Sequence, residues 1–533
     1  MLRVVAHLAA WLPFVADAVR LVRHGWRPVG DEAAIALRSW NSLTAHGPMV
    51  GQATRLAHGV FDPGPLEYWL LAIPVHLDTA HGILWGAVIC CLVACSLAIE
   101  AAWSVLGVAG GLCASGFILG LVLWTPDITA PPSWNPWFGV VFFTAALAAA
   151  WAVMSGRRGW WPVLVITASI AAQVHLMFTV PSGVLTILAL IIGLVDTIRA
   201  RSRYWWVLIG AVAGAACWSA PLIQQFTSPN GNLGLLFSTS GTATGPRTGG
   251  AFSLKALSAA MGPPPLWWKS HLQPAAIFNL ISHRSAWFAV AALILIAVAG
   301  VTAIRPLRCR PLAALAIVTL VISLGSLVTY SSIPVHYTSL GTLPYLVVLL
   351  FPVGVLSWLV VGSWAVLMAG LIAGRVDAAG RVRTRLLAAG QGATQWAGGA
   401  ARLAGLTASA LAAVGVVLAL LVQGPVDHKV TNDPAMPASL RISRQIARDL
   451  PGQPIALSVY ASDPSVRGRL TLGLTWELTP RGFHAEIKHT RLARELGDWY
   501  VYRGGPIPHV WVRVRLHGAS VKVIRPPGSA SHG

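Results

Sequence analysis

The chain has 533 residues, of which 55% are hydrophobic and only 11% are charged. A soluble globular protein averages about 25% charged residues. Several apolar runs of about 20 residues follow one another, which is the length needed to cross the hydrocarbon core of a bilayer. The composition excludes a soluble enzyme and predicts an all-α polytopic membrane bundle.

The net charge of +20 does not point to nucleic acid, because the arginines gather in four clusters on alternate loops. Such an arrangement follows from the positive-inside rule for cytoplasmic loops. The clusters are Arg157 and Arg158, then Arg199, Arg201 and Arg203, then Arg305, Arg308 and Arg310, then Arg375, Arg381, Arg383 and Arg385.

About eleven membrane spans are expected, and no cleavable signal peptide is evident before them. They lie roughly at 4–22, 81–99, 104–124, 137–154, 161–180, 181–198, 205–222, 286–304, 311–330, 343–373 and 402–423. With a cytoplasmic N-terminus, all four arginine clusters lie inside, and the loops 23–80 and 223–285 lie outside. Two spans in the long run 343–373 would place the C-terminal tail on the cytoplasmic side of the membrane. We therefore expect one tilted helix there.

Residues 1–423 are therefore interpreted as the membrane domain and 424–533 as a small extracytoplasmic α/β domain. Turn signals such as Pro451-Gly452 and Asp463-Pro464 separate its expected elements. These are helices at 440–450 and 466–478, a short apolar run at 455–460, and strand-like runs at 499–502 and 510–516.

Acidic residues are scarce before residue 424, and half of them lie in the first outer loop. These are Asp31, Glu32, Asp62, Glu67 and Asp78. Carboxylates near a membrane are costly and tend to mark function, although a water-exposed loop also simply tolerates charges. The adjacent pair Asp31-Glu32 follows the first span directly and is the strongest candidate for an active site.

Several motifs resemble the GT-C superfamily of integral membrane glycosyltransferases. That superfamily includes protein O-mannosyltransferases, the lipid A aminoarabinose transferase and the RgtA/B/C/D-like enzymes. The matching features are the outer Asp31-Glu32 pair after the first helix, Phe61-Asp62-Pro63-Gly64-Pro65-Leu66-Glu67-Tyr68, and Trp134-Asn135-Pro136-Trp137. Gln173-x-His175, Trp218-x-x-Pro221 and Gly231-Asn232-Leu233 resemble stretches in actinobacterial members. Phe61-Asp62 stands where His-Pro often precedes the family's Pro-Gly-Pro.

The resemblance implies transfer of a sugar from a polyprenyl-phosphate carrier to a cell-envelope acceptor on the outer face. A carboxylate can take the proton of an acceptor hydroxyl as it attacks the anomeric carbon. Asp31 is expected to be this base in an inverting reaction. Glu32 is expected to substitute for it or to orient the acceptor, with Asp62 and Glu67 as secondary candidates.

A departing phosphate needs cationic partners. The first 423 residues contain two lysines, both in the loop 223–285, which also holds other basic residues. The candidates are Arg247, Lys255, Lys269, His271, His283 and Arg284. A solvated loop with ordinary charges is the alternative interpretation. His175, expected in the middle of a span, and His336-Tyr337, in a short outer loop, are further substrate-binding candidates.

None of the six cysteines lies in an outer loop or the tail, and no metal-ligand spacing with histidine is visible. No cofactor is assigned, and a divalent cation at Asp31-Glu32 is left open. Competing functions are a lipid-linked sugar transporter or flippase, an outer-face glycan ligase or polymerase, and a non-enzymatic assembly protein. No internal repeat of the transporter kind is visible.

Overall fold

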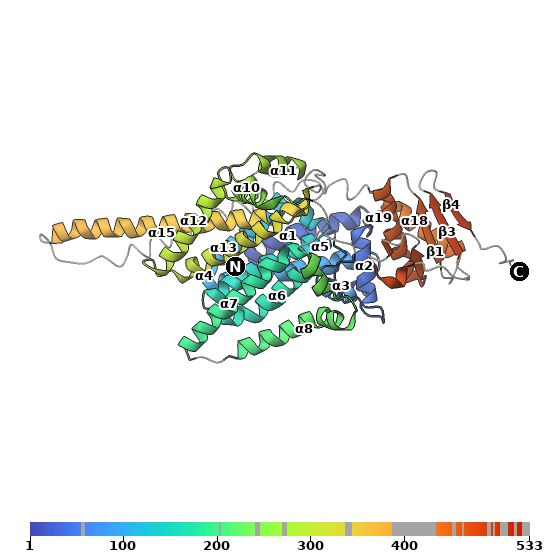
Figure 1. Ribbon diagram of the computed structural model, residues 1–533, viewed down its shortest axis with the longest axis horizontal. Helices are drawn as coiled ribbons and strands as arrows, with labels where there is room; N and C mark the ends of the chain where they lie inside the picture. The colour runs from blue at the N-terminus through green and yellow to red at the C-terminus, as the bar shows by residue number, and fades with distance from the viewer. Residues whose placement is uncertain are drawn as a thin grey trace.

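A computed structural model describes residues 1–54, 59–201, 204–239, 246–268, 274–335, 344–385, 433–449, 455–460, 463–487, 492–493, 496–501, 510–515 and 520–524. Within these ranges eight helices are long and apolar enough to cross a membrane. The chain is therefore a polytopic helical membrane protein. Figure 1 shows the helices gathered in one bundle, with the C-terminal strands beyond one end of it.

The long helices begin and end close to the expected spans. They are α1 (Leu2–Arg23), α4 (Gly82–Trp124), α5 (Asn135–Met154), α7 (Thr179–Arg199), α8 (Trp205–Thr227), α12 (Trp287–Ile304), α13 (Arg310–Ser331) and α15 (Leu350–Arg385). Most of the run expected at 343–373 lies on the single helix α15, but Pro344–Val347 form the 3-10 helix η5 before it. The apolar stretch long enough to cross a membrane is Tyr345–Ile372. The span expected at 402–423 lies outside the described residues.

Helix α4 contains two of the expected spans, because the chain reverses at Gly107. This glycine has φ 60° and ψ −138°, a backbone conformation that side chains disfavour. The two halves then pack so closely that a Cβ on Gly110 would collide with the carbonyl group of Ala102. A tight helical hairpin therefore replaces the pair of separated spans 81–99 and 104–124.

The prediction that His175 lies in the middle of a span was wrong. Helix α6 (Trp161–Val174) ends just before it, and His175 is extended, with φ −155°. The short 3-10 helix η3 (Leu176–Phe178) follows and leads into α7. The apolar run from 161 to 198 is continuous in composition, so hydropathy alone did not place the turn.

The bundle has one basic end and one acidic end. Arg3 pairs with Glu100, and Arg310 pairs with Asp196, at the end where the chain turns between α7 and α8 and between α12 and α13. The Asp31-Glu32 pair lies at the opposite end, because it follows the far terminus of α1. The first three arginine clusters thus share one end of the bundle, as their alternation predicted.

Shorter helices cover the acidic end. They are α2 (Asp31–Asn41), α3 (Leu66–Leu77), α9 (Asn232–Thr239), α10 (Gly249–Met261) and α11 (Pro274–Ser282), with the 3-10 helices η1 (Pro126–Thr129), η4 (Leu266–Trp268) and η5 (Pro344–Val347). Helix α2 packs on α3, and α10 packs on α13 and α15. Another 3-10 helix, η2 (Arg158–Trp160), lies at the basic end before α6.

The C-terminal elements form a four-stranded sheet with two helices. The helices are α18 (Ala435–Asp449) and α19 (Pro464–Leu478), and the strands are β1 (Ile455–Tyr460), β2 (Ala485–Ile487), β3 (Val510–Arg515) and β4 (Ser520–Ile524). The strand order is β2-β1-β3-β4, with β1 parallel to β2 and β3, and β4 antiparallel to β3. The short 3-10 helices η6 (Thr479–Arg481) and η7 (Asp498–Tyr500) complete this part, and η7 replaces most of the strand expected at 499–502.

Replacing Gly110 by alanine tests the hairpin in α4. A methyl group there would force apart two backbones in contact, so we expect a loss of about 1–3 kcal/mol in unfolding free energy. Thermal unfolding in detergent measures it. Gly362→Ala is the matched control, because Gly362 is a helical glycine with open space around it. Equal stability of both variants would contradict the tight hairpin.

Candidate active site

The candidate site begins at the first turn of α2. Gly30 precedes this helix with φ 60°, and Asp31 and Glu32 occupy the first two helical positions. Carboxylates are favoured there, because the unpaired N–H groups of a first turn carry partial positive charge. Both side chains are half-buried. The sequence order Gly-Asp-Glu thus turns the chain out of α1 and places two carboxyl groups at the acidic end of the bundle.

Asp31 is held by a tryptophan that enters from α5. The indole Nε1 of Trp134 donates a hydrogen bond to Asp31 Oδ2 at 3.0 Å. The Trp134 ring lies edge-on to Tyr345, with centroids 5.3 Å apart, and Tyr345 lies 5.2 Å from the ring of His175. Asp31 and His175, which are 144 positions apart, are therefore linked through two aromatic rings.

Asp62, in the first outer loop, is buried against the turn between α6 and α7. Its Oδ1 accepts from the backbone N–H of Leu176 at 3.1 Å, and Oδ2 accepts from Asn135 Nδ2 at 3.4 Å. Asn135 Nδ2 also donates to the carbonyl of Val174 at 3.2 Å. Burial raises the pKa of Asp62 well above its ordinary value, while the Leu176 and Asn135 hydrogen bonds and the charge of Arg38 oppose the shift.

A second buried carboxyl group, Glu67, lies close to Asp62. Glu67 is only 3% exposed, and burial followed by the charge of Asp62 raises its pKa well above the ordinary range. Its Oε1 has no hydrogen-bond partner within the described part of the chain. Arg38 stacks on Tyr68 with its guanidinium carbon 4.8 Å from the ring centroid, and its NH2 group donates to the carbonyl of Val50.

The motifs singled out in the sequence meet at this place. Phe61 exchanges two hydrogen bonds with the side chain of Asn232, at 2.9 and 3.0 Å. Gly64 packs directly against Gln173 and Pro221, so closely that a side chain at residue 64 would collide with both. Gln173 Nε2 donates to the carbonyl of Cys217 at 2.7 Å. Each of these polar residues ties the first outer loop to a helix end.

The described basic residues of the loop 223–285, which the sequence predicted to bind phosphate, make contacts within the loop or to its neighbours. Lys255 donates to the carbonyl of Ser282, and Arg284 donates to the carbonyls of Pro263 and Pro264. These side chains close the loop on itself. Arg247 lies in a backbone bridge to Pro334, and His283 is exposed. Lys269, His271, His336 and Tyr337 lie outside the described residues.

Sequence reasoning missed three residues that the fold brings to the site. Arg38 and Tyr345 are single residues in apolar stretches, with no motif around them. Arg469 comes from α19, and its backbone carbonyl accepts a 3.4 Å hydrogen bond from the N–H of Gly30. The structure buries Arg38, which is uncommon for an arginine, and the sequence shows only one arginine after an apolar stretch.

The two adjacent carboxyl groups differ in their surroundings. Burial raises the pKa of Glu32 to about 8, and the charges of Asp31 and then Asp433 add to this shift. A backbone hydrogen bond and the charge of Arg469 oppose it. With its pKa raised in this way, Glu32 keeps its proton to a higher pH than an ordinary glutamate and can then donate a hydrogen bond.

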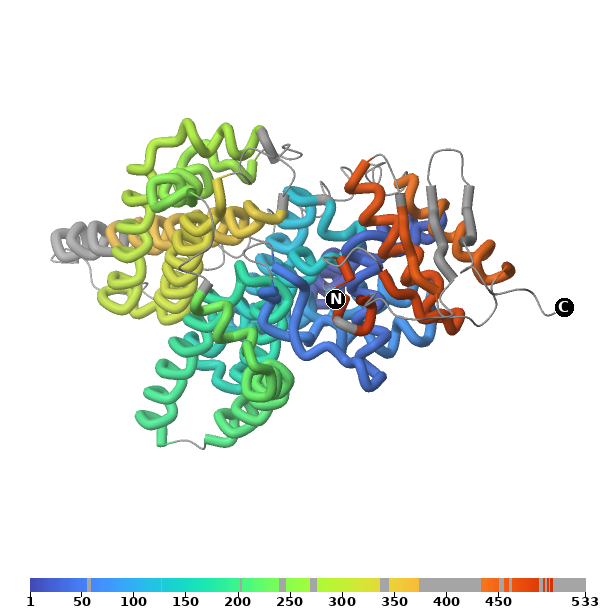
Figure 2. Tube along the Cα trace, turned by 45° about the vertical axis from the view of Figure 1, so that its right-hand side comes forward, coloured from blue at the N-terminus to red at the C-terminus, as the bar shows by residue number. Residues whose placement is uncertain are grey.

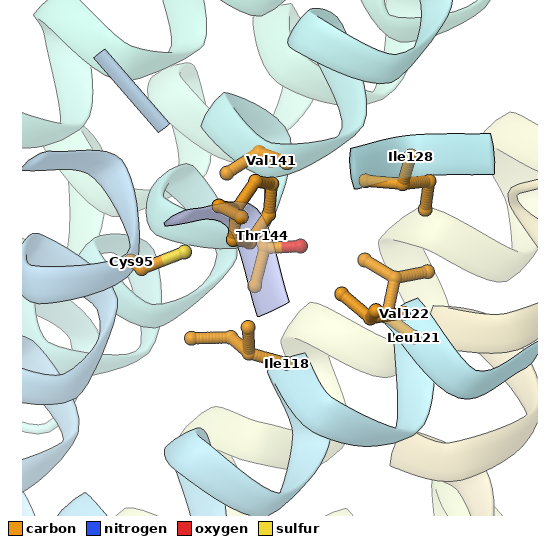
Figure 3. A pocket seen from close by; sticks show the side chains of 8 residues that line it. Cys95, Ile118, Leu121, Val122, Ile128, Val141 and Thr144 are labelled. Carbon is orange, nitrogen blue, oxygen red and sulfur yellow. The ribbon is translucent and has the colours of Figure 1, made fainter. Parts of the chain in front are cut away.

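A small apolar cavity lies deeper in the bundle, away from these residues. It is lined by Phe14, Cys95, Ile118, Leu121, Val122, Ile128, Val141 and Thr144, from α1, α4, α5 and η1 (Figure 3). Thr144 supplies the one hydroxyl group in its lining, and that group donates to the carbonyl of Val140. Among the described residues, no group of three or more His, Cys, Asp or Glu side chains lies close enough to hold a metal ion.

The fold and the site define a polytopic membrane protein with buried and half-buried carboxyl groups at one end of the bundle. Neither the family models nor the curated proteins searched give a match to this chain. The structure is similar to ArnT from Cupriavidus metallidurans bound to undecaprenyl phosphate, with 16% identity and a TM-score of 0.50. The likeness covers 94% of this chain and 92% of that one. ArnT from Cupriavidus metallidurans in the apo state matches over the same shares at 16% identity and a TM-score of 0.49.

The chain therefore shares the overall fold of this undecaprenyl-phosphate-bound ArnT structure. The expected helical membrane bundle is confirmed by this likeness of fold, and the resemblance of the motifs to the GT-C superfamily stays a prediction.

Truncating Asn232 tests how the first outer loop is attached. Asn232→Ala removes both hydrogen bonds to Phe61 and leaves buried backbone groups unpaired, so we expect a loss of about 1–3 kcal/mol in unfolding free energy. Thermal unfolding in detergent measures it. Asn230→Ala is the matched control, since Asn230 is exposed and two residues away. An unchanged melting temperature for Asn232→Ala would contradict this attachment.

Proposed function

We propose that the protein is a membrane glycosyltransferase that moves a sugar from a polyprenyl-phosphate donor to a hydroxyl group of a cell-envelope acceptor. The observation that carries the proposal is the position of Asp31, a half-buried carboxylate that accepts a hydrogen bond from Trp134. It lies at the end of the bundle opposite the first three arginine clusters. The likeness of fold to ArnT supports the proposal. The ArnT of known structure was found with undecaprenyl phosphate, a lipid of the proposed donor class.

The proposed chemistry assigns different roles to Asp31 and Glu32. Asp31 takes the proton of the acceptor hydroxyl as its oxygen forms a bond to the anomeric carbon. The bond from that carbon to the phosphate oxygen breaks, and the phosphate leaves with the electron pair. Glu32, when it carries its proton, donates a hydrogen bond that orients the acceptor. A single displacement of this kind inverts the anomeric configuration.

The donor phosphate needs positive charge as it departs. The loop 223–285 remains our proposal for this role, through Lys269 and His271. Lys255 and Arg284 are less suited, because backbone carbonyls already occupy their donors. Asp62, Glu67 and His175 line the same end of the bundle and are proposed to form the wall of the substrate site.

The orientation in the membrane follows from charge. The first three arginine clusters lie at the end of the bundle opposite Asp31, and the positive-inside rule favours a cytoplasmic location for that end. We propose that Asp31 and the C-terminal domain of residues 424–533 are extracytoplasmic, in the inner membrane of a bacterium.

Asp31→Asn should abolish sugar transfer while leaving the fold intact. The amide keeps an oxygen for the Trp134 hydrogen bond but cannot take a proton at neutral pH. Losing a general base costs a factor of about 10²–10⁴ in rate. Transfer from a defined polyprenyl-phosphate sugar in nanodiscs measures it. Asp78→Asn is the control, since this aspartate is 47% exposed in the same loop. Full activity of Asp31→Asn would remove Asp31 from the mechanism.

Glu32→Gln should change the response to pH more than the rate at pH 7. Because the folded protein holds the pKa of Glu32 at about 8, above its unfolded value, the protonated carboxyl stabilises the fold at low pH. That stabilisation is lost as pH rises from about 4.5 through about 8. Across this pH range the melting temperature of the wild-type protein should therefore fall relative to that of Glu32→Gln. Parallel curves for the two proteins would contradict the raised pKa.

A further inference from the structure

The C-terminal helix α19 lies directly on the N-terminus of α2. Figure 2 shows the C-terminal segment against the first part of the chain. The carbonyl of Arg469 accepts from Gly30, and the Arg27 N–H points at the sulfur of Met436, 3.4 Å away. Further along, Trp476 meets Trp40 edge-on, and Asn41 Nδ2 donates to the hydroxyl of Tyr500 at 3.0 Å. Contacts thus run along the whole of α2 from its acidic end.

Arg469 covers the residue just before the acidic pair. A Cβ on Gly30 would lie 3.0 Å from Cγ and 3.5 Å from Cδ of Arg469, so the side chain of this arginine rests on the glycine. Its NH1 group forms a 3.0 Å ion pair with Oδ2 of Asp433, a carboxylate whose side chain is 6% exposed. The Nε atom of Arg469 is buried and has no hydrogen-bond partner among the residues described.

Three acidic side chains and one guanidinium therefore share this corner. Asp31 comes from α2 with Glu32, Asp433 precedes α18, and Arg469 comes from α19. The titratable groups of α3, which also packs on α2, face elsewhere: Glu67 faces Asp62, and His76 stacks on Trp40. The charge of Arg469 favours ionised Glu32, and the charge of Asp433 opposes it.

We propose that Arg469 and Asp433 are positioning residues of the active site, so that α19 is part of the catalytic centre. Arg469 holds the turn at Gly30 and balances the acidic pair, and Asp433 fixes the guanidinium in place. The C-terminal domain then determines how Asp31 and Glu32 are oriented and at which pH Glu32 loses its proton. This inference rests on the proposed function for its kinetic test but has a separate chemical readout.

Opposite substitutions should move the titration of Glu32 in opposite directions. The full-length protein is labelled with a carbodiimide, which reacts with protonated carboxyl groups, and the labelling of Glu32 is followed by mass spectrometry against pH. Arg469→Gln should shift its midpoint to higher pH, and Asp433→Asn should shift it to lower pH. Arg444→Gln is the matched control, because Arg444 is exposed on α18.

The kinetic test uses the same variants in the transfer assay. Arg469→Gln should lower kcat by about tenfold or more with little change in KM for the donor, and Arg469→Lys should recover part of the loss. A fold-change of ten corresponds to about 1.4 kcal/mol in the barrier. If wild type transfers no sugar but the midpoints shift as expected, the proposed function fails and the positioning pair stands. If the labelling midpoint of Glu32 is unchanged in both Arg469→Gln and Asp433→Asn, the positioning role of Arg469 and Asp433 is wrong, even if the enzyme is active.

Discussion

The burial of Asp62 is the constraint on which the site depends. A carboxyl group in a nearly dry environment must find hydrogen-bond donors, because an unpaired one is expensive. Asp62 finds them at the Leu176 N–H and at Asn135, which belong to two different helical elements. The first outer loop is thereby joined to the α6–α7 turn and to the start of α5. The same start of α5 carries Trp134, which holds Asp31.

This arrangement explains why polar residues are found at the ends of apolar helices. Asn135, Gln173 and Asn232 each begin or end a helix, and each satisfies backbone groups of another segment. Irregular backbone at the edge of a membrane is stable only when such partners exist. Between α2 and α3 the first outer loop also has backbone hydrogen bonds of its own, from the Gly51 N–H to the Asp62 carbonyl and from the Thr54 N–H to the Val60 carbonyl. The helix ends below it and this pairing together fix the position of Asp62.

Much of this could be predicted from the sequence, and the failures have physical causes. Hydropathy depends on local composition, so most of the long apolar helices were predicted near their observed positions. The boundaries expected near 100–103 and 180 lie a few residues from the turns observed at Gly107 and His175, because composition marks such turns only loosely. The phosphate-binding role of the loop 223–285 stays a prediction, and the sequence did not show that Lys255 and Arg284 donate to backbone carbonyls of their own loop. Arg469 lies 438 positions beyond Asp31, and contact between two docked domains is not encoded in any local pattern.

The division of labour between the two carboxyl groups also comes from tertiary contacts. Adjacent residues in one helix turn have the same local sequence context, and yet Asp31 accepts a hydrogen bond from Trp134 while the charges of Asp433 and Arg469 act on Glu32. One side of the turn belongs to the membrane bundle and the other to the C-terminal domain. A base must stay ionised, and an orienting group must keep its proton. In the proposed mechanism Arg469 and Asp433 act on the protonation of Glu32, so the contact of α19 with the start of α2 itself acts on the chemistry.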